Sequence, residues 1–224
     1  MSFSELYGTL NKEELEEFYK SVFMIMDGET AEKARYAYYR QTLRHIGENV
    51  RIGRFVKMTN PQFISIGNNV TIDDDCTLIA RGEAGISLAD NVTLKHRVYL
   101  DTEGTDGYIE IGKSVYIGTG CTLHGHKGLE IMEHSLLAQN ITITPYSHIS
   151  DDCNRKIIEQ GGHSRKVTIE KDCYIGMGCC ILYGADIHEG SVVGSGSVVV
   201  RSIPPYSIAV GVPAKVIKKR GERK

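Results

Sequence analysis

The sequence IEKDCYIGMGCCILYGADIHEGSVVGSGSVV, residues 169–199, decides the fold because an aliphatic residue returns at every sixth position. These leading positions are Ile169, Ile175, Ile181, Ile187, Val193 and Val199. A period of six fits neither the 3.6-residue turn of an α-helix nor the two-residue alternation of a strand. Hexapeptide repeats are typical of a β-helix, in which three short strands form one triangular coil and aliphatic side chains stack on the next coil.

The same period runs back along the chain to residue 46, with one long interruption. The earlier leading positions are Ile46, Ile52, Met58, Ile66, Ile72, Leu78, Leu88, Leu94, Leu100, Ile111, Ile117, Leu123, Ile131, Leu137 and Ile143. All positions together make seven triplets, which predicts an all-β protein with a parallel β-helix of about seven coils over residues 46–200. Extra residues enter only between triplets, so they are predicted to leave one edge of the prism. The longest insertion, residues 144–168, is predicted to be one long protruding loop.

The two ends of the chain lack the repeat. Residues 1–45 are predicted to form a small α-helical cap, because Asn11 and Glu14 make a capping box and Gly28 separates a second helix at about residues 30–44. The tyrosines of this second helix either seal the first coil or reach the acceptor of a neighbouring subunit. Residues 201–224 are predicted to be a C-terminal tail segment.

Composition excludes several classes of function. The chain has 26 Lys and Arg against 28 Asp and Glu, so the electrostatic footprint of a nucleic-acid-binding protein is absent. It has no apolar run of eighteen residues, and residues 1–17 are polar and acidic where a signal peptide would be basic and then apolar. We therefore expect a cytoplasmic protein with no nucleic-acid partner and no membrane insertion.

The spacing of the six cysteines does not indicate a disulfide framework. Cys76, Cys121, Cys173 and Cys179 each lie four residues after a leading aliphatic, in a place that is regularly small or branched. They are predicted to be small buried hydrophobes, which leaves Cys153 and Cys180 as free thiols. No Cys-x-x-Cys pair occurs, so a zinc ribbon is not expected.

The repeats, with the endings at residues 203–208 (IPPYSI) and 211–217 (GVPAKVI), resemble the left-handed β-helix, or hexapeptide-repeat, acetyltransferases. The insertion, with His148 and Glu-Gln-Gly at 159–161 ahead of Cys-Tyr-Ile-Gly at 173–176, is similar to the branch that O-acetylates sugars of surface polysaccharides. Galactoside, maltose and streptogramin acetyltransferases are related to that branch. The resemblance implies left-handed coils, acetyl-CoA as co-substrate, no metal, and a homotrimer with sites in the clefts between neighbouring prisms.

His148 matches the position of the family's catalytic histidine. A neutral imidazole can remove the proton of a hydroxyl as the hydroxyl attacks a thioester, a gain of roughly 10²- to 10⁴-fold. A backbone N–H near the coil edge would stabilise the charge that develops on the thioester oxygen. This chemistry needs no enzyme nucleophile and predicts direct transfer in a ternary complex. The alternative is a solvated loop histidine, and the match to the family position favours the base.

Four further residues are predicted to contact the acceptor. Asn140 resembles a family asparagine that helps hold the acceptor, although an Asn at a β-helix corner also tolerates a left-handed backbone. Tyr146 and Ser147 directly precede the histidine. His163, in the same insertion, is either an acceptor contact or a solvated loop residue.

The resemblance also places the CoA contacts. Tyr174 stands where many relatives carry Trp and would pack against the pantetheine arm. Glycines and a serine would let the backbone approach that arm closely, and basic residues would meet the phosphates, although Lys218 equally fits a solvated basic tail. The full set of predicted CoA contacts is Tyr174, Gly176, Gly178, Ser195, Gly196, Arg201, Lys215 and Lys218.

The sequence therefore predicts an acetyl-CoA-dependent O-acetyltransferase acting on a sugar or surface-polysaccharide precursor. An amino-sugar or antibiotic acceptor is the first alternative, and a non-catalytic β-helix scaffold is the second. A zinc hydratase like the γ-class carbonic anhydrases is the third, because His124 and His126 form a His-x-His pair. That class uses a His-x-x-x-x-His spacing, which this pair lacks, so both histidines are expected at an exposed corner.

Overall fold

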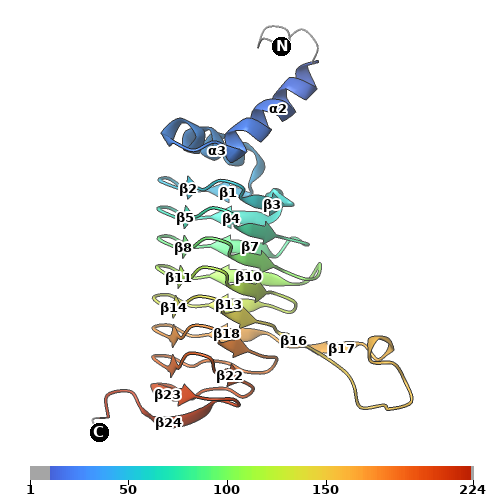
Figure 1. Ribbon diagram of the computed structural model, residues 1–224, viewed down its shortest axis with the longest axis vertical. Coiled ribbons are helices and arrows are strands. Elements are labelled where there is room, and N and C mark those ends of the chain that lie inside the picture. The colour runs from blue at the N-terminus through green and yellow to red at the C-terminus, as the bar shows by residue number, and fades with distance from the viewer. Residues whose placement is uncertain (1–10, 223–224) are drawn as a thin grey trace.

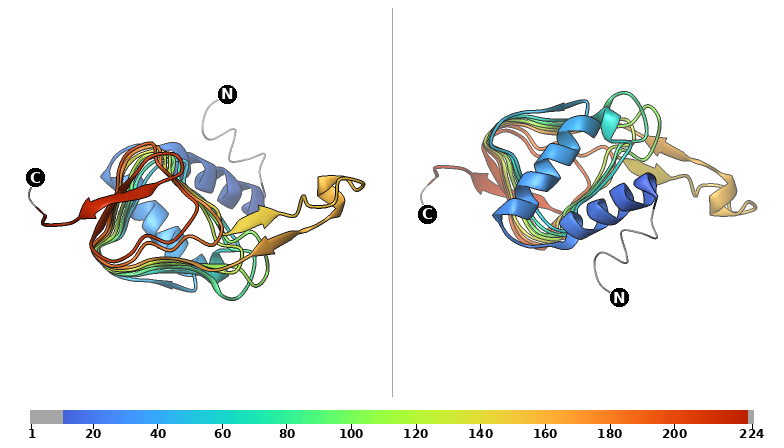
Figure 2. Two further views of the ribbon diagram at one scale, coloured as in Figure 1. Left: turned by 90° about the horizontal axis from the view of Figure 1, so that it is seen from below. Right: turned by 90° about the horizontal axis from the view of Figure 1, so that it is seen from above.

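The protein, described by a computed structural model over residues 11–222, is a triangular prism of stacked coils with two helices on one end (Figures 1 and 2). Helix α2 (Lys12–Ile25) begins at the predicted capping box, in which the Asn11 side chain accepts from the Glu14 amide and the Glu14 carboxylate accepts from the Asn11 amide. Helix α3 (Glu29–Thr42) lies across the top of the prism (Figure 2). None of the described helices is long and apolar enough to cross a bilayer.

Three parallel sheets form the three faces of the prism, and each of the first six coils contributes one strand to each sheet. The seventh coil contributes a strand to two of the sheets and an isolated bridge at Ile187 to the third. The six-stranded sheet contains β1 (His45–Ile46), β4 (Ile64–Ile66), β7 (Gly85–Leu88), β10 (Tyr108–Ile111), β13 (Leu129–Ile131) and β18 (Val167–Ile169). The seven-stranded sheet contains β3 (Lys57–Thr59), β6 (Thr77–Ile79), β9 (Tyr99–Asp101), β12 (Thr122–His124), β15 (Thr142–Ile143), β20 (Cys180–Ile181) and β22 (Val198–Val199). The nine-stranded sheet contains β2 (Arg51–Ile52), β5 (Thr71–Ile72), β8 (Thr93–Leu94), β11 (Tyr116–Ile117), β14 (Leu136–Leu137), β19 (Tyr174–Ile175), β21 (Val192–Val193), β23 (Ser207–Val210) and the antiparallel β24 (Lys215–Lys219).

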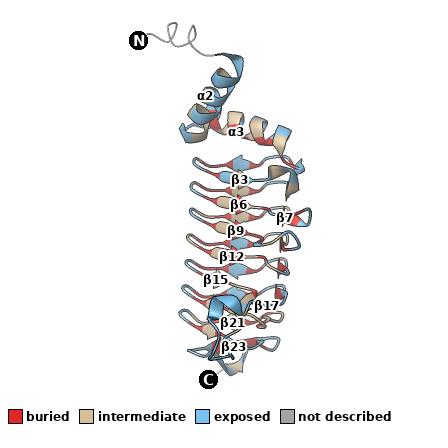
Figure 3. Ribbon diagram, turned by 90° about the vertical axis from the view of Figure 1, so that its right-hand side faces the viewer, coloured by how far each residue is buried: buried red, intermediate tan, exposed pale blue. Residues whose placement is uncertain are grey.

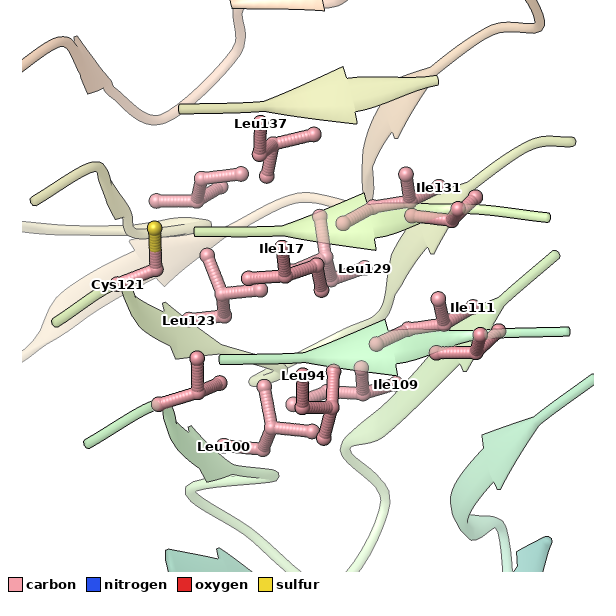
Figure 4. Close-up of a cluster of buried hydrophobic side chains, with 14 of the residues drawn as sticks. Leu94, Leu100, Ile109, Ile111, Ile117, Cys121, Leu123, Leu129, Ile131 and Leu137 are labelled. Atoms are coloured by element: carbon pink, nitrogen blue, oxygen red, sulfur yellow. The ribbon is translucent and has the colours of Figure 1, made fainter. Parts of the chain in front are cut away.

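The core is a set of aliphatic columns along the prism axis. Leu94, Ile117 and Leu137 are fully buried and are paired in register on successive strands of one sheet, so each side chain stacks on the one below (Figure 4). This stacking confirms the prediction of a β-helix of about seven coils. Four cysteines share this core, as predicted. Burial raises the pKa of the Cys76 thiol to about 12 and of the Cys121 thiol to about 11, which keeps them protonated and unreactive.

Two edges of the prism are regular and the third is not. At the regular edges the chain turns through one residue in the left-handed region, such as Asn91 (φ 60°) or Asn140 (φ 56°). The third edge, between the seven-stranded and six-stranded sheets, takes the extra residues between triplets, as predicted, and loops project there (Figure 2). We call it the arm edge, because the 144–168 insertion leaves the prism at this edge.

The helical cap is joined to the first coil by a buried arginine. Arg35 in α3 is 1% exposed and donates to the main-chain oxygen of Ile52 at 2.7 Å. It also donates to the carbonyls of Phe23 (2.6 Å) and Met26 (2.8 Å) at the end of α2. One side chain therefore satisfies carbonyls of the helix end and of the coil that the helix covers.

The tyrosines of α3 seal the first coil. The hydroxyl of Tyr36 donates to the carbonyl of Gly47 and that of Tyr39 to the carbonyl of Val56, both at 3.0 Å. Both side chains are therefore hydrogen-bonded to the first coil of the β-helix. Tyr38 packs instead on Phe23 of α2, with ring centroids 5.9 Å apart.

The coil stacking continues past residue 200. Strand β23 pairs in parallel with β21, and β24 folds back antiparallel on β23. Arg220 then donates to the Asp172 carboxylate at 2.7 Å and to the carbonyl of Gly190 at 3.1 Å. The last residues that the structure describes are therefore packed against the last coils.

Candidate functional site

The predicted protruding loop is an antiparallel ribbon. Strand β16 (Tyr146–His148) pairs with β17 (Gly162–Ser164), and a short 3-10 helix, η2 (Ile157–Glu159), lies in the loop between them. This ribbon, residues 146–164, is called the arm. It stands away from the prism, and most of its residues are exposed (Figures 1 and 3).

His148 lies on the same face of the arm as Tyr146, because side chains two residues apart on a strand point to the same side. Its imidazole is exposed and perpendicular to the Tyr146 ring, with centroids 4.9 Å apart and an interplanar angle of 86°. The Tyr146 ring in turn stacks on His126, at 4.8 Å and 21°. The predicted base is thus solvent-accessible and in edge-to-face contact with Tyr146.

Ser147 and His163 lie on the opposite face of the arm, where the strand register pairs them directly. The His163 ring lies beside Tyr183, at 6.5 Å and 30°, at the next coil of the arm edge. The four residues that were expected to contact one acceptor are therefore not together. Three of them are divided between the two faces of the arm, and Asn140 lies at another edge of the prism. Their contact with an acceptor stays a prediction.

His124 and His126 are not the exposed corner residues that the sequence suggested. Both are half-buried on the arm edge, and Nδ1 of His124 is 3.0 Å from a carboxylate oxygen of Glu103. Burial lowers the pKa of His126, which favours its uncharged form. Among residues 11–222 no group of three or more His, Cys, Asp and Glu side chains is arranged to hold a metal ion.

A second edge, between the nine-stranded and seven-stranded sheets, is rich in glycine. We call residues 118–120, 138–140, 176–178 and 194–196 the glycine edge. Asn140, Gly178 and Gly196 occupy equivalent left-handed corners, with φ of 56°, 66° and 70°. The amide of Gly178 donates to the carbonyl of Gln139 and that of Gly196 to the carbonyl of Met177, so these corners stack directly.

The predicted CoA glycines have two different roles in this edge. A Cβ at Gly176 would lie 2.5 Å from the amide nitrogen of Ser195, so this glycine is required for coil stacking. A Cβ at Gly178 or Gly196 would meet nothing within 4 Å, so these two leave open surface beside the backbone. Only the open pair can admit a thin ligand along the edge.

The other predicted CoA contacts are distributed over the lower coils. Tyr174 is 42% exposed and lies on the outer face of the nine-stranded sheet, in register with Leu136. Arg201 is exposed on the arm edge, after β22. Lys215 and Lys218 lie on β24, where Lys215 is exposed and Lys218 half-buried. A single chain does not gather these cations around one point.

His148 and Asn140 are likewise at different edges of the same prism. The arm leaves between β15 and β18, whereas Asn140 turns between β14 and β15. The predicted base and the open glycines are therefore separated by the seven-stranded sheet within one chain.

Comparison with known proteins identifies the family. Residues 166–201 match the model described as bacterial transferase hexapeptide (six repeats). The chain is 30% identical over 180 residues to dTDP-4-amino-4,6-dideoxy-D-glucose acyltransferase of Escherichia coli, a match that covers 80% of this chain and 84% of that protein. The chain belongs to the hexapeptide-repeat acyltransferases.

This chain spans about half the length of two other relatives that it matches. A probable acetyltransferase of Mycobacterium tuberculosis is 33% identical, covering 76% of this chain and 56% of that protein. Galactoside O-acetyltransferase of Escherichia coli is 33% identical, covering 51% and 56%. Among solved structures, the fold resembles a variant of AntD, an N-acyltransferase from Bacillus cereus, with a TM-score of 0.60 at 24% identity, covering 84% of this chain and 89% of that chain.

Two contacts at the arm edge were not predicted from the sequence. Tyr183 contacts His163, and Glu103 contacts His124. Both follow the end of a triplet, so a systematic list of the residues at the arm edge would have included them.

Proposed function

We propose that this hexapeptide-repeat acyltransferase moves an acetyl group from acetyl-CoA to a hydroxyl of a sugar or surface-polysaccharide precursor, with His148 as general base. The observation that carries the proposal is the exposed imidazole of His148, held by aromatic packing on an arm that projects from the acyltransferase prism. The galactoside O-acetyltransferase among the relatives supports a sugar hydroxyl as acceptor.

In the proposed reaction the acceptor oxygen attacks the thioester carbonyl carbon while its proton passes to the imidazole of His148. The tetrahedral intermediate carries its negative charge on the former carbonyl oxygen, where a backbone N–H of the prism would stabilise it. Collapse breaks the carbon–sulfur bond, and the thiolate of CoA takes the proton back from the imidazolium. Acetylated acceptor and free CoA result, with no covalent enzyme intermediate.

The separation of the two edges supports an oligomer as the active form, and the family resemblance implies that this oligomer is a homotrimer. Because His148 and the glycine edge lie apart in one chain, a site that uses both needs the arm of one prism beside the glycine edge of another. The outer face of the nine-stranded sheet carries Tyr116, Leu136 and Tyr174 in register, each 36–42% exposed. Such a contiguous apolar strip fits an interface between subunits.

An amino-sugar acceptor is the second candidate, because the Escherichia coli relative is named as an acyltransferase of an amino sugar. A base at His148 would serve either acceptor, since an amine also loses a proton during acyl transfer. The experiment measures CoA thiol release from acetyl-CoA with sugars and sugar nucleotides offered as matched pairs, with a hydroxyl or an amino group on the same carbon.

Faster thiol release with the hydroxyl member of a pair supports O-acetylation. Faster release with the amino member would show that the reaction is N-acetylation. An antibiotic hydroxyl belongs in the same panel as the remaining type of acceptor. If the protein binds no CoA at all, the scaffold interpretation holds and the proposed function is wrong.

The open glycines give a direct test of CoA binding. Gly196→Asn is expected to weaken CoA binding by about tenfold or more, because Asn tolerates the left-handed backbone but its side chain fills the open surface. Isothermal titration with CoA measures the change. The matched control is Gly221→Asn, which adds the same side chain at another open, positive-φ glycine away from the glycine edge.

Mixed trimers then test how the site is assembled. Subunits with His148→Ala and subunits with Gly196→Asn are unfolded together, refolded together and assayed for acetyl transfer. Partial recovery of activity is expected, because some interfaces then join an intact arm to an intact glycine edge. Recovery that never exceeds the sum of the two separate variants would place both elements in the same subunit's site and contradict the shared-site proposal.

A further inference from the structure

The Tyr146 ring lies between two imidazoles. One face stacks on His126 at 4.8 Å, and the same ring is perpendicular to His148 at 4.9 Å. Aromatic rings at these separations attract one another beyond the effect of the area that they bury. Tyr146 is thus in contact both with the prism and with the exposed imidazole.

Gly162 on β17 makes room for this ring. A Cβ at Gly162 would lie 2.1 Å from the Tyr146 hydroxyl oxygen, so the tyrosine lies across the backbone of the neighbouring strand. Gly162 is also the register partner of His148. Strand β17 therefore has no side chain at the position that the Tyr146 ring crosses.

His126 provides a fixed surface behind the tyrosine. It lies in the short loop from β12 to β13, where the Gly125 amide donates to the carbonyl of Asp101 at 2.8 Å. Asp101 is fully buried, and its carboxylate accepts two hydrogen bonds from Arg81, at 2.8 and 2.7 Å. The loop that holds His126 is therefore braced by the coil above it.

The opposite face of the arm is held separately. His163 lies beside Tyr183, and Arg165 donates to the Asp186 carboxylate at 2.6 Å. These contacts attach the arm to the next coil at the point where the arm joins the prism. None of them involves the ring of His148. Fixing the arm and fixing the imidazole are thus tasks of different residues.

We propose that Tyr146, backed by His126, is a positioning residue that fixes the plane of the His148 imidazole. This inference rests on the proposed function of His148 as the base. The perpendicular contact restricts rotation of the imidazole about its own side-chain bond, so that the proton-accepting nitrogen stays aimed at the acceptor. Tyr146 acts through His148 and takes no proton itself.

The kinetic test compares variants that move the ring with variants that keep it. Tyr146→Leu and Gly162→Ala are each expected to lower kcat by roughly 10- to 100-fold with the KM for acetyl-CoA nearly constant, because a small misorientation of a reacting group has effects of this size. Gly162→Ala is the sharper variant, since it displaces Tyr146 without removing any ring. Tyr146→Phe, which keeps the ring, is expected to recover most of kcat.

Tyr183→Leu is the matched control, because it removes a tyrosine ring from the other face of the arm. It is expected to change kcat by less than about threefold. An equal loss of kcat in Tyr183→Leu and Tyr146→Leu would mean that general fixing of the arm matters and would overturn the inference. A rise in the acceptor KM in Tyr146→Phe, with kcat recovered, would add a hydroxyl contact to the acceptor and leave the positioning role intact.

NMR gives a readout that does not depend on acetyl transfer. With ¹³C-labelled histidine, the ring signal of His148 is assigned by its loss in His148→Gln. Tyr146→Leu and Gly162→Ala are expected to shift this signal, because the ring current of Tyr146 no longer acts on it, whereas Tyr183→Leu is not. An unchanged His148 signal in Tyr146→Leu would overturn the positioning role. If the signal shifts but His148→Ala transfers acetyl normally, the packing holds and the base assignment of the proposed function fails.

Discussion

His148→Ala is expected to lower kcat for acetyl transfer by roughly 10²- to 10⁴-fold, the contribution typical of a positioned general base. The acceptor hydroxyl then attacks as the neutral alcohol, with no group to receive its proton. The affinity for CoA is expected to stay nearly constant, because His148 is proposed to take the proton of the acceptor and is not among the predicted CoA contacts. Steady-state kinetics with the best acceptor, together with CoA titration, measures both quantities.

His45→Ala is the matched control for this result. His45 is an exposed histidine on β1, at the cap end of the prism. Its replacement is expected to leave kcat unchanged, which separates the effect of the arm position from any general effect of losing an exposed imidazole. Full activity in His148→Ala would remove the base from the proposed mechanism.

Leu123→Ala is expected to lower the free energy of unfolding by about 2 to 5 kcal/mol. Leu123 is fully buried on β12, and its register partners on the two neighbouring strands are Leu100 and Ile143. Figure 4 shows Leu100 and Leu123 stacked in the core. Truncation leaves a cavity that the neighbouring coils cannot close, because the sheet hydrogen bonds fix their spacing. Urea denaturation at one fixed protein concentration measures the change, since subunit association also contributes to stability.

The control for the core variant is the adjacent residue. Thr122 points outward from the same strand and is half-buried, so Thr122→Ala is expected to change the free energy of unfolding by less than about 1 kcal/mol. Similar losses in the two variants would mean that the strand itself, and not the aliphatic column, determines stability at this coil.

The fold was predictable because one chemical requirement repeats. Every coil must bury an aliphatic residue at the same place, so positions such as Leu94 and Ile117 mark the strands directly in the sequence. The position of the insertions was predictable for the same reason, since only one edge lies between triplets. The start of the first helix at Asn11 was predictable from its capping box, because this motif depends only on residues close together in the sequence.

The arrangement of the candidate site was not predictable. Strands β16 and β17 carry no hexapeptide period, and a one-residue change in their register would exchange the faces of Tyr146 and Ser147. The contact between His126 and Tyr146 joins segments twenty residues apart, and it depends on how the arm leaves the coil. The division of the site between two edges follows from the three-dimensional winding, which a linear pattern does not display.

The confinement of all long insertions to the arm edge has a consequence for redesign of this scaffold. Each insertion begins and ends at the same corner, so a loop there can be exchanged, lengthened or deleted while every sheet keeps its pairing. The open glycines, which are the proposed CoA contacts, occupy a different corner and are untouched by such exchanges. If the arm edge selects the acceptor and the glycine edge binds CoA, as proposed, the two specificities can be redesigned one at a time on the same prism.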